Sequence, residues 1–120
     1  GLLISENEEI SSQSDVFDSA KEILLLVEDN GELRYFLKTI FNPYFNIVEA
    51  VDGVAGFNMA KEVVPDVIIS DVMMPRKDGI RMMRELREEM STSHIPLVLL
   101  TAKSTVENKI EGIWSRRLYY

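Results

Sequence analysis

The chain has 120 residues, 46% hydrophobic and 28% charged, which fits one soluble domain with a single core. It contains no cysteine, so disulfides and thiolate metal sites are excluded, and we expect a reducing compartment, the cytoplasm. The net charge of -7 without a basic stripe argues against direct nucleic-acid binding, and no apolar run is long enough to span a bilayer.

Residues 1–20 differ in composition from the rest of the chain. They hold five of the 20 acidic residues and no Lys or Arg, and they are rich in serine without a period of 2 or 3.6. We therefore expect an acidic, Ser-rich linker or tail over residues 1–20, a folded domain over residues 21–113, and a tail of different pattern over residues 114–120.

Four apolar runs of strand length follow the acidic segment. They are Ile23–Val27 (ILLLV), Phe45–Val48 (FNIV), Asp66–Ser70 (DVIIS) and Ile95–Leu100 (IPLVLL). Three of them are apolar nearly throughout rather than alternating. This pattern predicts strands that are buried on both faces, as in a parallel sheet.

Segments with helical spacing of apolar residues separate these runs. The first helix should end before Pro43, which disfavours helical angles at Asn42. Strands that alternate with helices through short connections predict an α/β doubly wound parallel sheet. The apolar stripes are Leu33, Phe36, Leu37 and Ile40; Val54, Phe57, Ala60 and Val64; Ile80, Met83, Leu86 and Met90; and the start of a fourth, Val106, Ile110 and Ile113.

Polar residues stand at the ends of three of the predicted strands. Glu28 and Asp29 follow the first strand, Asp71 follows the third, and Thr101 follows the fourth. Ligands of doubly wound sheets bind outside the carboxyl ends of the strands, so we expect these side chains to converge. Clustered carboxylates repel one another unless a cation joins them, and oxygen ligands suit Mg²⁺. The pattern favours Mg²⁺-assisted phosphoryl transfer to Asp71.

Taken singly, such residues have ordinary structural roles. One acid after a strand is most often a helix cap or a turn residue. The Asp-Gly pairs at 52–53 and 78–79 are expected to be turns or helix starts, because Gly relaxes the backbone and Asp can cap. Met73 and Met74 are expected to be packing or loop residues, and His94 a surface or capping residue. The combination at successive strand ends favours a functional site.

The motifs together resemble the receiver domain of two-component signalling. The segments that carry the resemblance are ILLLVEDNGELRYFL, VEAVDGVAGFNMA, PDVIISDVMMPRKDG and HIPLVLLTAKS, over roughly residues 21–112. The same sequence segments are also similar to those of receivers attached to hybrid sensor histidine kinases. The resemblance implies a flavodoxin-like sheet of strand order 2-1-3-4 in three layers. It also implies a module that does not turn over substrate by itself.

The resemblance also implies roles for individual residues. Asp71 would accept a phosphoryl group from a histidine, carried by a histidine kinase or a histidine phosphotransfer domain. Asp29 would ligate Mg²⁺ directly, Glu28 would help to hold it, and the backbone carbonyl of Met73 would supply a further ligand. Thr101 would be the switch hydroxyl that moves towards the phosphoryl group.

The resemblance ends before the fifth strand and helix of a complete receiver. After about Ile113 the sequence departs from the family pattern, and no lysine follows Lys109 to take the place of the family's fifth-strand lysine. The alternative function is therefore a degenerate receiver, an interaction module without phosphotransfer in this truncated form. We expect the edge of the strand at Ile95–Leu100 to pair with a second copy, as a homodimer, or to be covered by the tail at Arg116–Tyr120.

An enzyme class also uses an Asp nucleophile after a strand, the haloacid-dehalogenase-type phosphatases. That chemistry needs a second Asp two residues after the nucleophile, and this chain has Met73 there. The receiver interpretation is therefore favoured over the phosphatase.

Overall fold

The computed structural model describes residues 17–100. Strands and helices alternate along this part of the chain, as the sequence predicts. The predicted helix that starts at Val106 lies outside the described residues. The elements are β1 (Glu22–Val27), α2 (Gly31–Phe41), β2 (Phe45–Ala50), α3 (Gly53–Val63), β3 (Val67–Asp71), α4 (Gly79–Glu88) and β4 (Leu97–Leu100).

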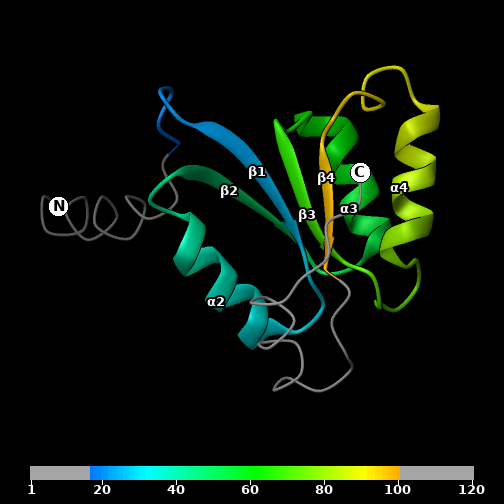
Figure 1. Ribbon diagram of the computed structural model, residues 1–120, viewed down its shortest axis with the longest axis horizontal. Coiled ribbons are helices and arrows are strands. Elements are labelled where there is room, and N and C mark those ends of the chain that lie inside the picture. Colours follow the sequence, from blue (N-terminus) through cyan, green and yellow to red (C-terminus); the bar gives the residue numbers. More distant parts are fainter. Residues whose placement is uncertain (1–16, 101–120) are drawn as a thin grey trace, which may run out of the picture.

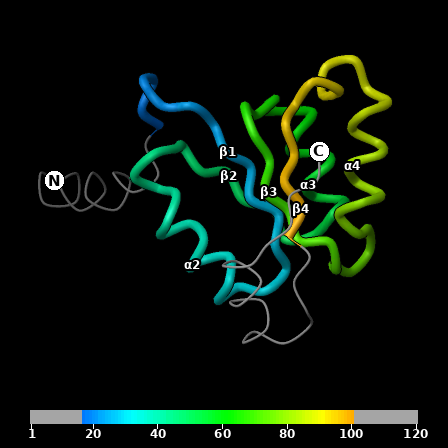
Figure 2. Tube along the Cα trace, in the orientation of Figure 1, coloured from blue at the N-terminus to red at the C-terminus, as the bar shows by residue number. Residues whose placement is uncertain are grey.

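The strands form one parallel sheet with the order β2-β1-β3-β4. Helix α2 lies on one face of the sheet, and α3 and α4 lie on the other (Figure 1). The predicted doubly wound, flavodoxin-like architecture of three layers is thus confirmed. Because every strand runs in the same direction, the carboxyl ends of β1, β3 and β4 meet at one edge of the sheet (Figure 2).

The core explains why the strands are apolar without alternation. Leu24 to Val27 of β1 are fully buried, since helices cover both faces of the strand. On the face under α3 and α4, the core includes Leu25, Val27, Ile68, Leu97 and Leu99. On the face under α2, a smaller cluster consists of Leu26, Leu33, Leu37 and Leu100.

All three predicted helix stripes within the described residues differ from the buried faces. In α3, Val64 is 39% exposed and lies just beyond the last helical residue. In α4 the fully buried side chains are Met82 and Leu86, whereas Ile80 is 37% exposed and Met90 is 93% exposed. Met90 lies beyond the end of the helix, and Ile80 lies in its first turn. In α2, Phe36 and Ile40 are 37% and 40% exposed, because the apolar stripe is wider than the contact with the sheet.

Helix α2 ends at Phe41 as predicted, but for a different reason. Asn42 keeps helical angles, with φ -55° and ψ -35°, and its N–H donates to the carbonyl of Lys38. Pro43 therefore does not displace Asn42 from the helical region. The helix ends because Pro43 has no N–H with which to continue the hydrogen-bond ladder.

Both Asp-Gly pairs are helix starts. The Asp52 carboxylate accepts a hydrogen bond from the N–H of Ala55 at 2.8 Å, and the Asp78 carboxylate accepts one from the N–H of Arg81 at 2.8 Å. These are N-cap contacts, as predicted. The predicted role of glycine is wrong, since no described glycine has a positive φ; at Gly53, a Cβ would lie 2.1 Å from the carbonyl oxygen of Lys77.

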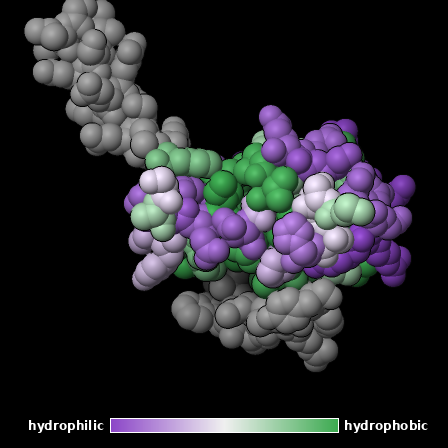
Figure 3. Space-filling model, turned by 90° about the horizontal axis from the view of Figure 1, so that it is seen from above, coloured by the Kyte–Doolittle hydropathy of each residue, from purple (hydrophilic) through white to green (hydrophobic). Residues whose placement is uncertain are grey.

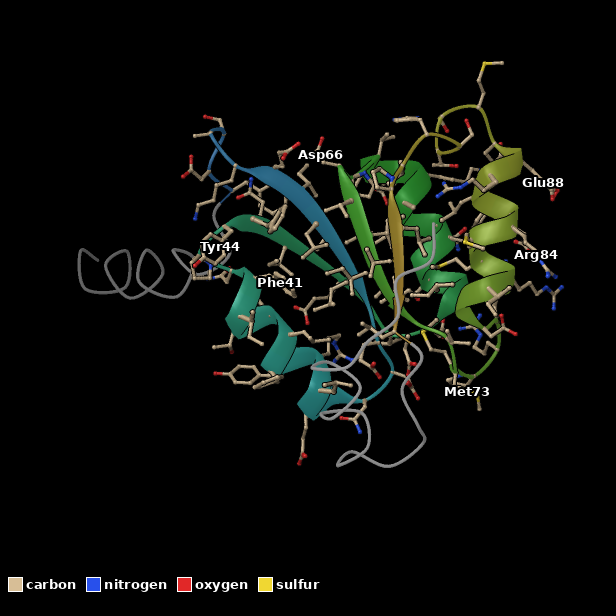
Figure 4. All side chains as sticks on the ribbon, in the orientation of Figure 1. Phe41, Tyr44, Asp66, Met73, Arg84 and Glu88 are labelled. Carbon is tan, nitrogen blue, oxygen red and sulfur yellow. The ribbon has the colours of Figure 1, made fainter. Side chains whose placement is uncertain are left out.

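The surface on the side of α4 is mostly hydrophilic (Figure 3). Arg84 and Glu88 point outward from this helix (Figure 4). None of the helices described between residues 17 and 100 is long and apolar enough to cross a membrane.

Candidate functional site

Three carboxylates meet at the carboxyl edge of the sheet. Glu28 and Asp29 follow β1 directly, Asp71 is the last residue of β3, and the two strands are hydrogen-bonded neighbours. One carboxylate oxygen from each residue lies within 4.8 Å of the others. The sequence predicted that these acids converge, and the structure confirms it.

The three acids differ in their exposure to solvent. Glu28 and Asp71 are each 1% exposed, whereas Asp29 is exposed. The sequence predicted that Asp71 follows the third strand. In the structure Asp71 is the last residue of β3, because it pairs with Leu100 of β4. Two of the three acids are therefore buried, and the third is accessible to solvent.

Backbone groups and one arginine orient the residues of this site. Oε2 of Glu28 accepts a hydrogen bond from the N–H of Asn30 at 2.9 Å, and Oδ1 of Asp71 accepts one from the N–H of Met73 at 3.3 Å. The Arg34 guanidinium donates to the backbone carbonyl of Glu28 at 2.8 Å. Backbone N–H groups of the segments after β1 and β3 thus hold the carboxylates of Glu28 and Asp71 in place.

The donor set fits a hard divalent cation. All three side chains supply carboxylate oxygen, which Mg²⁺ prefers, and Mg²⁺ usually takes one or two carboxylates while keeping several waters. A cation among them would offset the repulsion between negative charges, two of which are buried. No other group of three such acidic, His or Cys ligands is found among residues 17–100.

The methionines after Asp71 have the ordinary roles that the sequence predicted. Met73 is 62% exposed in the loop after β3, and Figure 4 shows it at the end of the molecule opposite Asp66. Met74 packs against the core under α3 and α4. The thioether of Met73 points away from the molecule, and the role of its backbone carbonyl stays a prediction.

Several predicted features lie outside the described residues. Thr101 is one of them, although Leu100 before it pairs with Asp71 in the sheet. The residues after Lys109, the tail at 114–120 and the predicted cover of the β4 edge also lie outside. His94 is described and exposed, which confirms the predicted surface position.

Residues that fix the loop between β3 and α4 were not identified from the sequence. Arg76 forms an ion pair with Asp52, and Lys77 forms one with Glu85. Arg76 and Asp52 are 24 residues apart, so no local pattern could predict their contact; Lys77 and Glu85 are eight residues apart, across the start of α4. The only local sign was a pair of basic residues between Pro75 and the cap of α4.

One carboxyl beside this loop has a shifted pKa. The Lys77 ammonium donates a hydrogen bond to the Glu85 carboxylate and lowers the pKa of that carboxyl below its ordinary value. Partial burial opposes the effect, and the charges of Lys77 and Arg81 add to it. The ion pair thus favours the charged form of Glu85, on the helix that follows the loop.

Known proteins match the chain in sequence. The family described as "Response regulator receiver domain" matches residues 24–116. Histidine kinase P4 of Formosa agariphila is 38% identical over 108 residues, which are 90% of this chain and 8% of that protein. Hybrid signal transduction histidine kinase D of Dictyostelium discoideum is 36% identical over 108 residues, 90% of this chain and 7% of that protein. The chain thus spans less than a tenth of each of these relatives.

A solved structure shares the fold. It is the receiver domain of a sensor histidine kinase from Pseudomonas aeruginosa, with a magnesium ion coordinated in its active-site cleft. The TM-score is 0.65 at 26% identity, over 77% of this chain and 79% of that one. The family match covers more than half of the chain and agrees with the strand order and the acidic cluster. The chain therefore belongs to the response regulator receiver domain family of two-component signalling.

Proposed function

We propose that this chain is a phosphoacceptor module, in which Asp71 takes a phosphoryl group from a histidine in the presence of Mg²⁺. The observation that carries the proposal is the cluster of Glu28, Asp29 and Asp71 within 4.8 Å at the carboxyl edge of the sheet. The magnesium ion in the Pseudomonas receiver supports the same assignment.

The proposed chemistry follows from the arrangement of the acids. An oxygen of Asp71 attacks the phosphorus of a phosphohistidine, the P–N bond breaks, and the electron pair stays on the imidazole nitrogen. The product is an acyl phosphate on Asp71. The N–H of Met73 orients the attacking carboxylate, and burial of Asp71 excludes water from its side chain. Bound Mg²⁺ would neutralise charge on the phosphoryl oxygens.

Four groups are proposed to hold the metal. Asp29 and Asp71 bind it directly, Glu28 helps to hold it, and the Met73 carbonyl supplies a further ligand. Asp29 is the exposed member of the cluster, so a hydrated ion that enters the site meets it first. Thr101 is proposed as the switch hydroxyl, whose contact with the phosphoryl group biases a two-state equilibrium.

The partner is proposed to be a histidine kinase or a histidine phosphotransfer domain. Both curated relatives carry the words histidine kinase in their names. Since the chain matches only a small part of each, we propose that it is the receiver part of a hybrid histidine kinase. A homodimer through the edge of β4 is proposed as a second association.

Beryllofluoride, a mimic of the phosphoryl group, tests the site without a partner. In NMR spectra recorded with Mg²⁺, its addition should shift the amide signals around Asp71 and Thr101. The Asp71→Asn variant should show no such shift, because the mimic needs the carboxylate. If the wild-type signals do not move, the chain acts instead as an interaction module that takes no phosphoryl group.

A further inference from the structure

The loop of residues 72–78, between β3 and α4, contains a residue in an unfavourable conformation. Arg76 has a φ of 70°, in the left-handed region that residues other than glycine rarely adopt. Such a conformation persists only where the surrounding contacts hold it in place. The contacts of Arg76 therefore show what fixes this loop, which follows Asp71 directly.

The Arg76 side chain is tied to a buried acid on another loop. Its NH1 lies 3.3 Å from Oδ2 of Asp52, whose side chain is 7% exposed while that of Arg76 is 64% exposed. The other oxygen of Asp52 caps α3 by accepting the N–H of Ala55. Asp52 is thus fixed by the helix, and the charge-assisted hydrogen bond holds Arg76 at a set position relative to α3.

The next residue provides a second attachment. The Lys77 ammonium pairs with Glu85 of α4 and lies 4.8 Å from the ring centroid of Phe57 in α3. Its side chain is 14% exposed, so this cation is largely enclosed. Two consecutive residues therefore join one loop to both helices on that face of the sheet. We call the contacts of Arg76 and Lys77 the loop anchor.

The other part of the loop contacts the acidic cluster. The N–H of Met73 donates to the carboxylate of Asp71 at 3.3 Å, and the N–H of Gly79 donates to the carbonyl of Val72 at 2.9 Å. The peptide groups beside Asp71 thus lie between the strand and the loop anchor. The loop anchor is thus connected through the backbone to these peptide groups, although Arg76 itself is not part of the cluster.

We propose that Arg76, held by Asp52, is a positioning residue that sets the Met73 peptide in the geometry with which the acidic cluster binds Mg²⁺. This inference rests on the proposed function, because it presupposes a cation at Glu28, Asp29 and Asp71. Arg76 is not one of the three acids of the cluster, and its effect on Mg²⁺ binding passes through the backbone between Arg76 and Met73.

The sign of the effect separates positioning from simple electrostatics. Arg76 carries a positive charge, so its removal should strengthen the binding of a cation if charge alone matters. If Arg76 positions the loop, its removal should weaken the binding. Arg76→Gln is therefore the decisive variant, whereas Asp52→Asn weakens binding in both cases and serves only to test the coupling.

The experiment is a Mg²⁺ titration of the whole 120-residue chain, followed by the amide NMR signals of Asp71 and Met73. Arg76→Gln should raise the dissociation constant about tenfold, as losses of residues that orient metal ligands do. The double variant with Asp52→Asn should weaken Mg²⁺ binding by clearly less than the product of the two single effects, and by about as much as the larger of them, because both substitutions remove the same contact. Without Mg²⁺, the Gly79 amide should exchange faster in Arg76→Gln than in the wild type.

Lys61→Gln is the matched control. Lys61 is an exposed cation that joins α3 to Glu89 at the end of α4 at 3.1 Å; its ammonium shares the Phe57 ring with Lys77 but takes no part in the contact between Arg76 and Asp52. Its removal should leave Mg²⁺ affinity unchanged. Equal or tighter Mg²⁺ binding by folded Arg76→Gln would overturn the inference alone. A wild-type chain whose signals do not respond to Mg²⁺ would overturn the proposed function, and the inference with it.

Discussion

Gly79 lies where any larger side chain would meet the strand that carries Asp71. A Cβ at this position would lie 2.3 Å from the backbone carbonyl oxygen of Asp71 and 3.0 Å from Cδ2 of Leu99. Backbone cannot yield as a flexible side chain can. We expect Gly79→Ala to lower the free energy of unfolding by about 2 kcal/mol in chemical denaturation.

Gly31 provides the control for that substitution. It is the first residue of α2, and the nearest atom to an added Cβ is NH2 of Arg34 at 4.0 Å. Gly31→Ala should therefore stabilise the protein by about 0.4–1 kcal/mol, because alanine loses less backbone entropy on folding. Equal effects of the two substitutions would contradict the close packing at Gly79.

Glu85 gives the stability a specific pH dependence. Lys77 lowers the pKa of Glu85 in the folded state, so the unfolded chain binds more protons at this residue. The stabilisation is present above the ordinary glutamate pKa of about 4.3 and is lost as the pH falls through the lower folded-state pKa. The unfolding free energies of wild type and Glu85→Gln should differ near pH 7 and converge in acid.

Denaturant titrations across this pH range measure the difference. Glu88→Gln, on the outward side of the same helix, controls for the loss of one negative charge (Figure 4). A gap between wild type and Glu85→Gln that stays constant down to the most acidic pH would show that the Lys77 contact does not act through the charge of Glu85.

At the scale of the elements, one buried amide joins the chain before β1 to strand β2. The side chain of Asn46 accepts the N–H of Asp18 at 2.7 Å and donates to the carbonyls of Asp18 and Lys21 at 2.8 and 3.0 Å. Asn46 is 7% exposed, whereas Asp18 is exposed and Lys21 is half-buried, so the three hydrogen bonds are partly buried.

We expect Asn46→Ala to destabilise the protein by about 1–3 kcal/mol, since three partly buried hydrogen bonds are lost. Thermal unfolding would show this as a drop in Tm of several degrees. Asn58→Ala, at an exposed position of α3, should be neutral or slightly stabilising, because alanine favours helix. A neutral Asn46→Ala would mean that the segment before β1 contributes little to stability.

The elements were predictable where one local pattern sufficed. Apolar runs without alternation identified the strands, because helices cover both faces of β1. Helix faces were less predictable: Met82 rather than Ile80 is buried in α4, since the close approach of Gly79 to β3 turns that side of the helix inward. The spacing of apolar residues cannot show such an approach.

At the scale of the whole molecule, topology made the acidic cluster predictable. Parallel strands bring their carboxyl ends to one edge, so acids at the carboxyl ends of β1 and β3 must be neighbours once the order β2-β1-β3-β4 is known. The contacts of Arg76 with Asp52 were not predictable, because they join two loops 24 residues apart through a positive φ at Arg76. The three acids of the cluster were thus accessible from the sequence, and the contacts that hold the loop after Asp71 were not.

The most direct test of the account is the intact mass of the chain after incubation with Mg²⁺ and phosphoramidate, a small donor with a P–N bond. The wild type should gain one phosphoryl group, and the gain should require Mg²⁺, because the buried Asp71 lies among the acids that are proposed to bind the ion. Asp71→Asn should gain none. A wild-type chain that takes no phosphoryl group, or an Asp71→Asn chain that takes as much, would contradict the assignment of Asp71 as the phosphoacceptor.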